Sequence, residues 1–223
     1  MTAILIDLFN TLVAGGDRRR IEVTAVIAAD LGVDPVRYQR LFSELWRDRL
    51  AGHLGDLPTT LLAVARRLGA EPSAEAVASA AGRRVALTRE LLRPDQPTLD
   101  TLDSLRAAGH RLGVVSNCTE ETAAIWPETM LARRFGAVAF SCALGVGKPD
   151  RRNYLLACDA LGALPGSACY VGDGADGELS GAVSAGLRAI QTTQYAQTDR
   201  TWAGERINML ADLVPLMLSG RPG

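Results

Sequence analysis

The sequence predicts an α/β fold: a doubly wound parallel sheet with an inserted α-helical domain. Three observations support this prediction. From residue 98 onward, short apolar segments alternate with helical segments at regular spacing. One further apolar segment, residues 3–9, stands apart from the others, and the long stretch that separates them contains no convincing strand. Polar residues suited to catalysis stand where several of the apolar segments end, as expected of a parallel sheet with a ligand crevice at its edge.

The first predicted element is a strand at residues 3–9, AILIDLF. A short and almost wholly apolar segment is typical of a strand that is buried on both faces. Asp7 is the only charged residue in it. Because a buried carboxylate needs a specific reason, Asp7 is a candidate functional residue.

Residues 15–94 are predicted to form the inserted helical domain. Its clearest helix begins at Asp34 and Pro35, as N-cap and first-turn proline, and carries an apolar stripe that includes Phe42 and Arg49. Further helices are expected near residues 18–31, 58–69 and 73–92. The prediction therefore divides the chain into a core, residues 1–14 and 95–223, and a helical cap, residues 15–94.

The remaining elements alternate along the chain. Helices are predicted at residues 98–108, 119–134, 150–161 and 178–185, and strands at residues 111–116, 137–142, 168–172 and 188–193. Because the carboxyl ends of parallel strands meet at one edge of the sheet, Asp7, Ser116, Asn117 and Asp173 are expected to lie together there, with Lys148 following the strand at residues 137–142.

Composition restricts the class of protein. The chain has 223 residues, of which 48% are hydrophobic and 22% charged, as expected of a globular protein with a sizeable core. The net charge of −1 and the scattered basic residues argue against nucleic-acid binding. No signal peptide and no membrane-spanning run is found, so no membrane partner and a cytoplasmic location are expected. The cysteines lack metal-site spacing and are expected to be reduced core thiols: Cys118, Cys142, Cys158 and Cys169.

Lys148 is the only lysine among 24 basic residues. A compact ammonium can lie between a carboxylate and a phosphoryl group, whereas the planar guanidinium of arginine is wider and more directional. A single lysine at the sheet edge therefore indicates a catalytic position.

These residues suit phosphoryl transfer to an aspartate. Asp7 would attack phosphorus and form an acyl phosphate, which divides one difficult displacement into two easier ones. Thr11, Ser116 and Asn117 would bind the phosphoryl oxygens, and Lys148 would neutralise charge.

The same edge of the sheet is predicted to hold Mg²⁺, which prefers oxygen ligands. The predicted ligands are the carboxylates of Asp7 and Asp173 and the main-chain carbonyl of Phe9. Glu178 is expected to orient a metal-bound water without touching the metal itself.

Four segments carry a resemblance to a known family: DLFNTLV (7–13), VVSN (114–117), GVGKPD (145–150) and VGDGADGELSGAVSAG (171–186). In order and strand context they resemble the four motifs of haloacid dehalogenase (HAD) superfamily hydrolases, most of which are Mg²⁺-dependent phosphatases. The resemblance implies a Rossmann-like core with a C1-type cap. It also implies a hydrolase that acts on a small phosphorylated metabolite through a phospho-aspartyl intermediate.

Phe9 departs from that pattern. Family phosphatases usually carry a second aspartate two residues after the nucleophile, which protonates the leaving oxygen and later activates water. A phenyl ring can do neither, and such general acid–base assistance is worth ~10²–10⁴ in rate.

The departure leaves two alternatives open. The first alternative is a 2-haloacid dehalogenase: in these family members the position of Phe9 is aromatic and no metal is used. The segment LWR (45–47) also resembles the dehalogenase segment whose arginine binds the leaving halide. This resemblance would make Arg47 an anion ligand. Asp173 and Glu178 argue against this activity, because a metal-free site does not need them. The other alternative is a weakly catalytic binding or regulatory protein. Arg18–Arg20 could meet an anionic substrate at the start of the cap or form a solvated helix face.

Overall fold

The computed structural model describes residues 2–219 and contains one six-stranded parallel sheet, with strand order β3-β2-β1-β4-β5-β6. This confirms the predicted α/β fold with a parallel sheet and flanking helices. The strands are β1 (Ala3–Ile6), β2 (Arg111–Ser116), β3 (Ala137–Phe140), β4 (Ala168–Gly172), β5 (Arg188–Thr192) and β6 (Glu205–Ile207).

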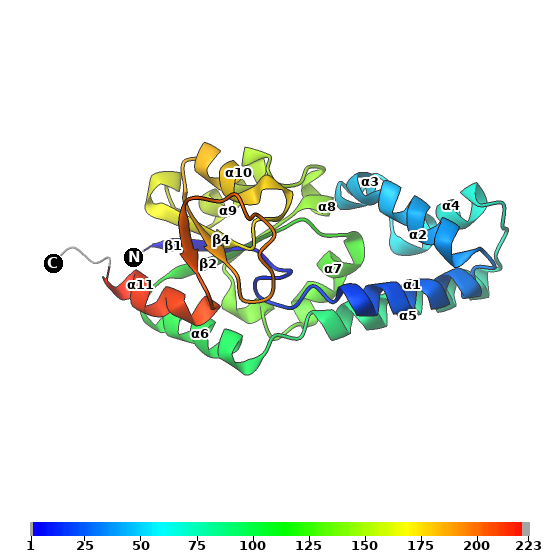
Figure 1. Cartoon of the computed structure of the whole chain (residues 1–223), viewed down its shortest axis with the longest axis horizontal. Coiled ribbons are helices and arrows are strands. Elements are labelled where there is room, and N and C mark those ends of the chain that lie inside the picture. Colours follow the sequence, from blue (N-terminus) through cyan, green and yellow to red (C-terminus); the bar gives the residue numbers. More distant parts are fainter. Residues whose placement is uncertain (1, 220–223) are drawn as a thin grey trace.

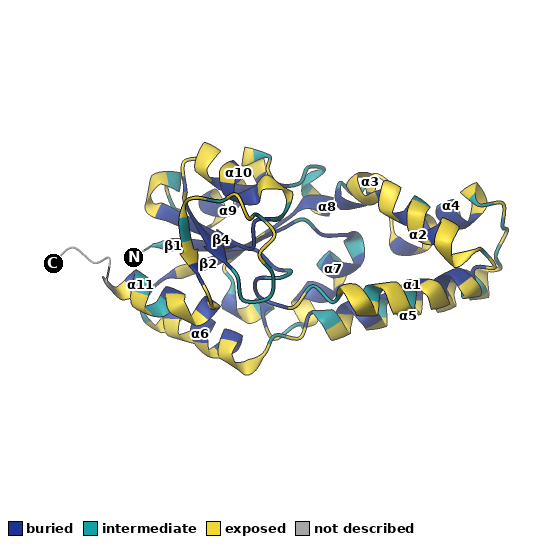
Figure 2. Ribbon diagram, viewed as in Figure 1, coloured by how far each residue is buried: buried dark blue, intermediate teal, exposed yellow. Residues whose placement is uncertain are grey.

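Alternate residues of β1 face two separate apolar cores, one on each side of the sheet. Ile4 and Ile6 join the core covered by α6 (Gln96–Ala107) and α11 (Leu213–Ser219). Ala3 and Leu5 join the core covered by α9 (Arg151–Ala160) and α10 (Glu178–Ser184). A strand buried on both faces must be apolar throughout, which explains the sequence of β1. Figure 2 shows the buried sheet between these helical layers.

Six helices lie between β1 and β2 in the sequence, and the first five of them form a separate unit. Figure 1 shows α1 and α5 side by side, extending away from the sheet, with α2 and α4 along them and with α3 between α2 and α8 (Ser141–Leu144). The first five helices enclose their own apolar core, which includes Tyr38, Phe42 and Leu61. These five helices are α1 (Asp17–Asp30), α2 (Pro35–Glu44), α3 (Trp46–Leu50), α4 (Leu57–Arg67) and α5 (Ala74–Leu91).

Local chemistry fixes where the cap helices begin. The Asp34 carboxylate accepts a hydrogen bond of 2.8 Å from the main-chain N–H of Arg37, and Pro35 occupies the first turn, where no N–H is required. Asp56 caps α4 in the same way, and the Ser73 hydroxyl caps α5.

Three predicted elements end earlier than expected. The strand predicted at residues 3–9 ends at Ile6, so Asp7 lies just beyond it. The helix predicted at residues 119–134 stops as α7 (Glu120–Ile125) and continues as 3₁₀ turns, since Pro127 lacks the N–H that an α-helix needs. The strand predicted at residues 137–142 ends at Phe140 and passes into a short helix, α8 (Ser141–Leu144).

The sequence predicted neither β6 nor α11. β6 has only three residues, Glu-Arg-Ile, which show no strand periodicity. The four cysteines are buried and free. Among the described residues, no helix combines the length and the apolar character required to cross a membrane.

Candidate active site

The strand order brings two carboxylates together at the carboxyl edge of the sheet. β1 lies between β2 and β4. The chain adds β2 and β3 on one side of β1, and then adds β4, β5 and β6 on the other side. The change of direction makes a topological switch point at the end of β1. Asp7 follows β1, and its N–H donates a hydrogen bond of 2.9 Å to the carbonyl of Val171 in β4. Asp173 follows β4 directly. Both side chains are buried where α/β proteins bind their ligands.

Lys148 lies in the loop before α9, and its ammonium donates three hydrogen bonds inside the site. Its Nζ atom donates to Asp7 and to Glu178, and at 3.0 Å to the Tyr170 hydroxyl. The Tyr170 hydroxyl in turn donates to Glu178 at 2.6 Å. Because an ammonium has three protons, each proton of Lys148 has an acceptor.

Glu178 begins α10, and its carboxylate lies against the main chain at the end of β4. The main-chain N–H of Gly174 donates to it at 2.9 Å. Any Cβ on Gly172 would collide with the same carboxylate, so β4 must end in glycine here. The position at the start of a helix also favours a negative charge.

Asp7, Asp173 and Glu178 form a buried acidic cluster, and each offers a carboxylate oxygen within 4.8 Å of the others. Asp173 is held in place by the Ala175 N–H at 3.1 Å and by the Thr198 hydroxyl. Carboxylate oxygens in this number suit a hard divalent cation such as Mg²⁺.

Burial and charge act against each other on the ionisable groups. Burial raises the pKa of Asp7, and the charge of Lys148 opposes that rise. Burial likewise raises the pKa of Glu178, to about 8, with Lys148 again opposing. Burial alone would lower the pKa of Lys148, but Asp7 and Glu178 raise it above its ordinary value. Lys148 therefore stays protonated, and additional positive charge at the cluster would favour ionised carboxylates.

Thr11, Ser116 and Asn117 contribute polar groups around Asp7. The Thr11 hydroxyl donates to the Asp7 carboxylate at 3.1 Å. The Asn117 side chain accepts from the main-chain N–H of Lys148 at 2.6 Å, which holds the lysine loop against the end of β2. The Ser116 hydroxyl is buried and has no hydrogen-bond partner among the residues the structure describes, so it can donate to a ligand.

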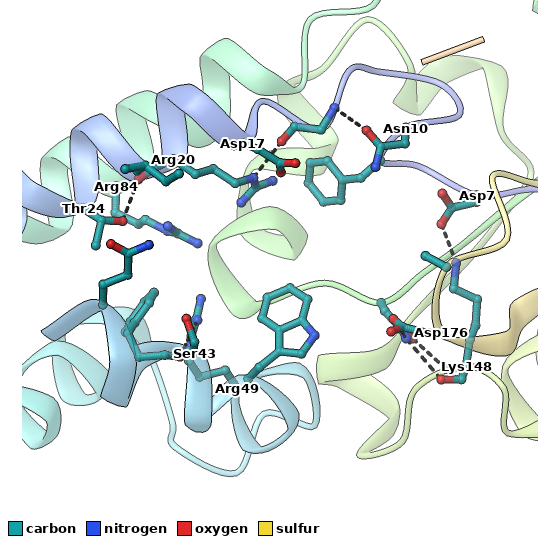
Figure 3. Close-up of a pocket in the computed structure, with 18 residues that line it drawn as sticks. Asp7, Asn10, Asp17, Arg20, Thr24, Ser43, Arg49, Arg84, Lys148 and Asp176 are labelled. Carbon is teal, nitrogen blue, oxygen red and sulfur yellow. Dashed lines mark hydrogen bonds and ion pairs between the residues drawn. The ribbon is translucent and has the colours of Figure 1, made fainter. Parts of the chain in front are cut away.

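A cavity of about 530 Å³ extends from Asp7 and Lys148 into the cap (Figure 3). The rings of Phe9, Phe42 and Trp46 line it, and so do guanidinium groups from three cap helices: Arg20 of α1, Arg49 of α3 and Arg84 of α5. The cavity thus connects the acidic cluster at the sheet edge with a basic lining in the cap.

The family model of haloacid dehalogenase-like hydrolases matches residues 1–186. The chain belongs to this family. It is therefore a hydrolase, and the polar groups at the edge of its sheet agree with this class of enzyme.

Individual HAD relatives carry two kinds of name. A glyceraldehyde 3-phosphate phosphatase from Methanopyrus kandleri is 29% identical over 196 residues, 85% of this chain and 82% of that protein. The (S)-2-haloacid dehalogenase 4A from Burkholderia cepacia is 29% identical over 125 residues, 53% of this chain and 52% of that protein. The crystal structure of a 2-haloacid dehalogenase from Pseudomonas syringae pv. Tomato DC3000 has a TM-score of 0.72 at 23% identity, covers 99% of this chain and 100% of that one, and shares the fold.

Most of the predicted HAD site residues lie together. Asp7, Thr11, Ser116, Asn117, Lys148, Asp173 and Glu178 all surround the crevice. Glu178 lies closer to the centre than predicted, since it contacts Lys148 and belongs to the acidic cluster. The Phe9 ring lines the cavity, and the guanidinium of Arg20 stacks on it at 4.8 Å from the ring centre.

Arg47 lies elsewhere. Its side chain is exposed, and it lines an adjacent cavity of about 670 Å³ together with Asn117 and Lys148, not the cavity that contains Asp7. Its role as an anion ligand stays a prediction.

Sequence reasoning missed Arg49 and Arg84 as site residues. The available signal was the place of Arg49 on the apolar stripe predicted for the second cap helix, because a buried arginine needs a partner or a function. Arg84 gave no such signal, since it lies in an Arg-Arg doublet that resembles a solvated face.

Proposed function

We propose that this HAD hydrolase is a Mg²⁺-dependent phosphatase that acts on a small phosphorylated metabolite through a phospho-aspartyl intermediate on Asp7. The observation that carries the proposal is the buried acidic cluster of Asp7, Asp173 and Glu178, in which Lys148 is ion-paired to two of the three carboxylates. The relative named a glyceraldehyde 3-phosphate phosphatase, which matches most of the chain, supports the same reaction class.

The cluster fits Mg²⁺. Its donors are all oxygens, and three carboxylates share one ammonium, so the site has negative charge to spare for a divalent cation. Asp7, Asp173 and the main-chain carbonyl of Phe9 would hold the ion, with Glu178 beside them. When bound, it would supply positive charge that offsets repulsion between the Asp7 carboxylate and an incoming phosphate.

In the first step, a carboxylate oxygen of Asp7 attacks phosphorus as the bond between phosphorus and the leaving oxygen breaks. Thr11 holds the Asp7 carboxylate, the Ser116 hydroxyl donates to a phosphoryl oxygen, and Lys148 stabilises the charge on both groups. In the second step, water attacks the same phosphorus, which releases inorganic phosphate and restores Asp7.

Both steps need proton transfer that Phe9 cannot provide. The leaving oxygen must gain a proton, or depart as a stable anion, and the attacking water must lose one. We infer that the leaving oxygen takes its proton from water or departs as a stable anion. We also infer that hydrolysis of the acyl phosphate is slow relative to its formation, because no side chain at position 9 accepts the proton of the attacking water.

A screen of sugar phosphates, nucleotides and acyl phosphates tests the proposal. We expect phosphate release that requires Mg²⁺ and that is lost in an Asp7→Asn variant. The proposal fails if no substrate in the screen is turned over faster than by the Asp7→Asn control.

Phe9 favours a second candidate function, a metal-independent 2-haloacid dehalogenase, since halide leaves carbon without needing a proton. The relative from Burkholderia cepacia bears that name over about half of the chain. Halide release from 2-chloropropionate in the presence of EDTA would support it. Strict dependence of all activity on Mg²⁺ would exclude it.

A further inference from the structure

We propose that Arg20, Arg49 and Arg84 form a cationic subsite in the cap that binds a second anionic group of the substrate, a carboxylate or a phosphate, while the first phosphate lies at Asp7. This inference rests on the proposed phosphatase function and narrows its substrate class to compounds with two anionic groups.

The first observation is that two of these arginines are buried and that the third, Arg20, is half-buried. Arg49 is 7% exposed and Arg84 is 5% exposed. Long cationic side chains are almost never buried to this degree unless they are paired, because removing the charge from water is costly. The arginines come from three helices, so the cap as a whole brings them together.

The second observation is that the subsite holds more positive than negative charge. Arg84 pairs with the buried carboxylate of Glu121 at 2.9 Å. Among the described residues, Arg49 forms no ion pair; it donates to the main-chain carbonyl of Phe42 at 3.2 Å. Arg20 donates to the carbonyl of Gly15 at 2.8 Å. Asp17, the other carboxylate at this end of the cavity, is exposed.

The guanidinium groups also lie against aromatic rings. Arg49 stacks 3.5 Å from the centre of the Phe42 ring, and Arg20 stacks on Phe9. Stacking occupies the flat face of a guanidinium and leaves its N–H edge available for a carboxylate or phosphate. Arg49 and Arg20 each donate one N–H group to a main-chain carbonyl, so their remaining N–H groups are left for a ligand.

The subsite and the reaction centre share one cavity. The same 530 Å³ space is lined by Asp7 and Lys148 at one end and by the three arginines at the other, as Figure 3 shows. A single small molecule can therefore reach both ends.

The pKa values agree with an excess of positive charge. Burial and the charge of the neighbouring Arg84 lower the pKa of Arg49 to about 9, although the charge of Glu121 opposes them. Burial and the charge of Arg84 also lower the pKa of Arg20, to about 10. An anion bound among them would oppose both effects.

The test measures binding by isothermal titration calorimetry to the full-length Asp7→Asn protein with Mg²⁺, so that the probes are not consumed. One series of probes consists of linear ω-phosphorylated carboxylates of increasing chain length, and a second of alkanediol bisphosphates. The matched controls are alkyl phosphates of the same lengths. We expect at least one two-anion probe to bind tenfold or more tightly than its alkyl phosphate, and the two series show whether carboxylate or phosphate is preferred.

In the same background, Arg49→Gln is expected to weaken binding of that two-anion probe by roughly tenfold to hundredfold, the effect of losing a hydrogen bond between charged groups. Binding of the alkyl phosphate should change less than threefold. Arg49→Lys keeps the charge, so its affinity for the two-anion probe should lie between those of the Asp7→Asn protein and its Arg49→Gln variant. Arg40→Gln, on the exposed surface of α2, is the matched control and should change neither affinity.

The inference is overturned if no two-anion probe is preferred at any length, or if Arg49→Gln weakens both kinds of probe equally. Turnover by the unmutated protein is measured separately. Selective binding that depends on Arg49 without Mg²⁺-dependent hydrolysis of any probe would contradict the phosphatase proposal and leave the subsite standing.

Discussion

At the scale of single residues, Lys148 has the most tightly specified geometry. Its ammonium donates one hydrogen bond each to Asp7, Glu178 and Tyr170. Lys148→Arg keeps the charge but replaces a compact donor with a planar fork. We expect the rate of phosphate release to fall by about 10²–10³, the usual cost of a lost transition-state donor.

Circular dichroism should show that Lys148→Arg remains folded. The reverse exchange at an exposed position, Arg66→Lys, is the control and should keep full activity. Near-normal turnover in Lys148→Arg would show that the site needs positive charge of any shape.

Phe9 leads to a prediction about the lifetime of the intermediate. Because position 9 carries a phenyl ring and not the carboxylate that activates water in most family phosphatases, protein treated with acetyl phosphate should carry a phosphoryl group on Asp7 that survives until intact-mass measurement. Phe9→Asp should shorten that lifetime, by up to about 10²-fold if the new carboxylate takes over the base role. A wild-type adduct that disappears as soon as donor is removed would mean that another group already activates water.

At the scale of elements, α5 of the cap and α7 of the core are joined by the ion pair between Arg84 and Glu121, in which both side chains are buried. Arg84→Met would leave the Glu121 carboxylate buried without its partner. We expect a loss of about 3–5 kcal/mol in the free energy of unfolding. Urea titration measures it, and the double variant Arg84→Met/Glu121→Leu should recover most of the loss.

The same pair has a defined pH dependence. Burial alone would raise the pKa of Glu121, but Arg84 lowers it below its ordinary value. The wild-type pair therefore contributes fully at neutral pH, and its contribution is lost as the pH falls below about 4.5 and through the lowered pKa. In Arg84→Met the charge of Arg84 no longer opposes the effect of burial on the pKa of Glu121. The gap in unfolding free energy between the two proteins should therefore be largest near pH 7 and shrink toward pH 4. A gap that is constant with pH would rule out Glu121 as its cause.

Elements with strong local signals were predictable from the sequence. The helices that begin at Pro35 and at Gln96 have capping residues, and the buried strands are mostly apolar. β6 was not predictable, because three residues pair with β5 for reasons of tertiary position alone. Residues at strand ends could be assigned to one edge of the sheet, since parallel topology brings those ends together.

The arginines of the cap could not be found in the same way. Arg20, Arg49 and Arg84 come from three helices, and their approach depends on the angles at which those helices pack. Hydrophobic periodicity says which face of a helix is buried but not which other helix it meets.

At the scale of the whole molecule, Mg²⁺ binding should stabilise the folded chain, because the acidic cluster is assembled only by folding. At ten times its dissociation constant, the ion would add about 1.4 kcal/mol. For a chain of this size, that corresponds to a rise of roughly 3–5 °C in melting temperature. Asp173→Asn should abolish the shift, whereas Asp103→Asn, which removes an acid distant from the cluster, should keep it. An equal shift in all three proteins would place the bound ion elsewhere.

The single lysine also gives the protein a built-in chemical reporter. Apart from the N-terminal amine, Lys148 is the only primary amine in the chain, and it is 7% exposed and held by two carboxylates. An acylating reagent should therefore label the folded protein quickly at one amine and very slowly at the second. The rate of that second acylation, followed by intact mass and without any need for a substrate, measures how often Lys148 leaves its two carboxylates and loses its proton.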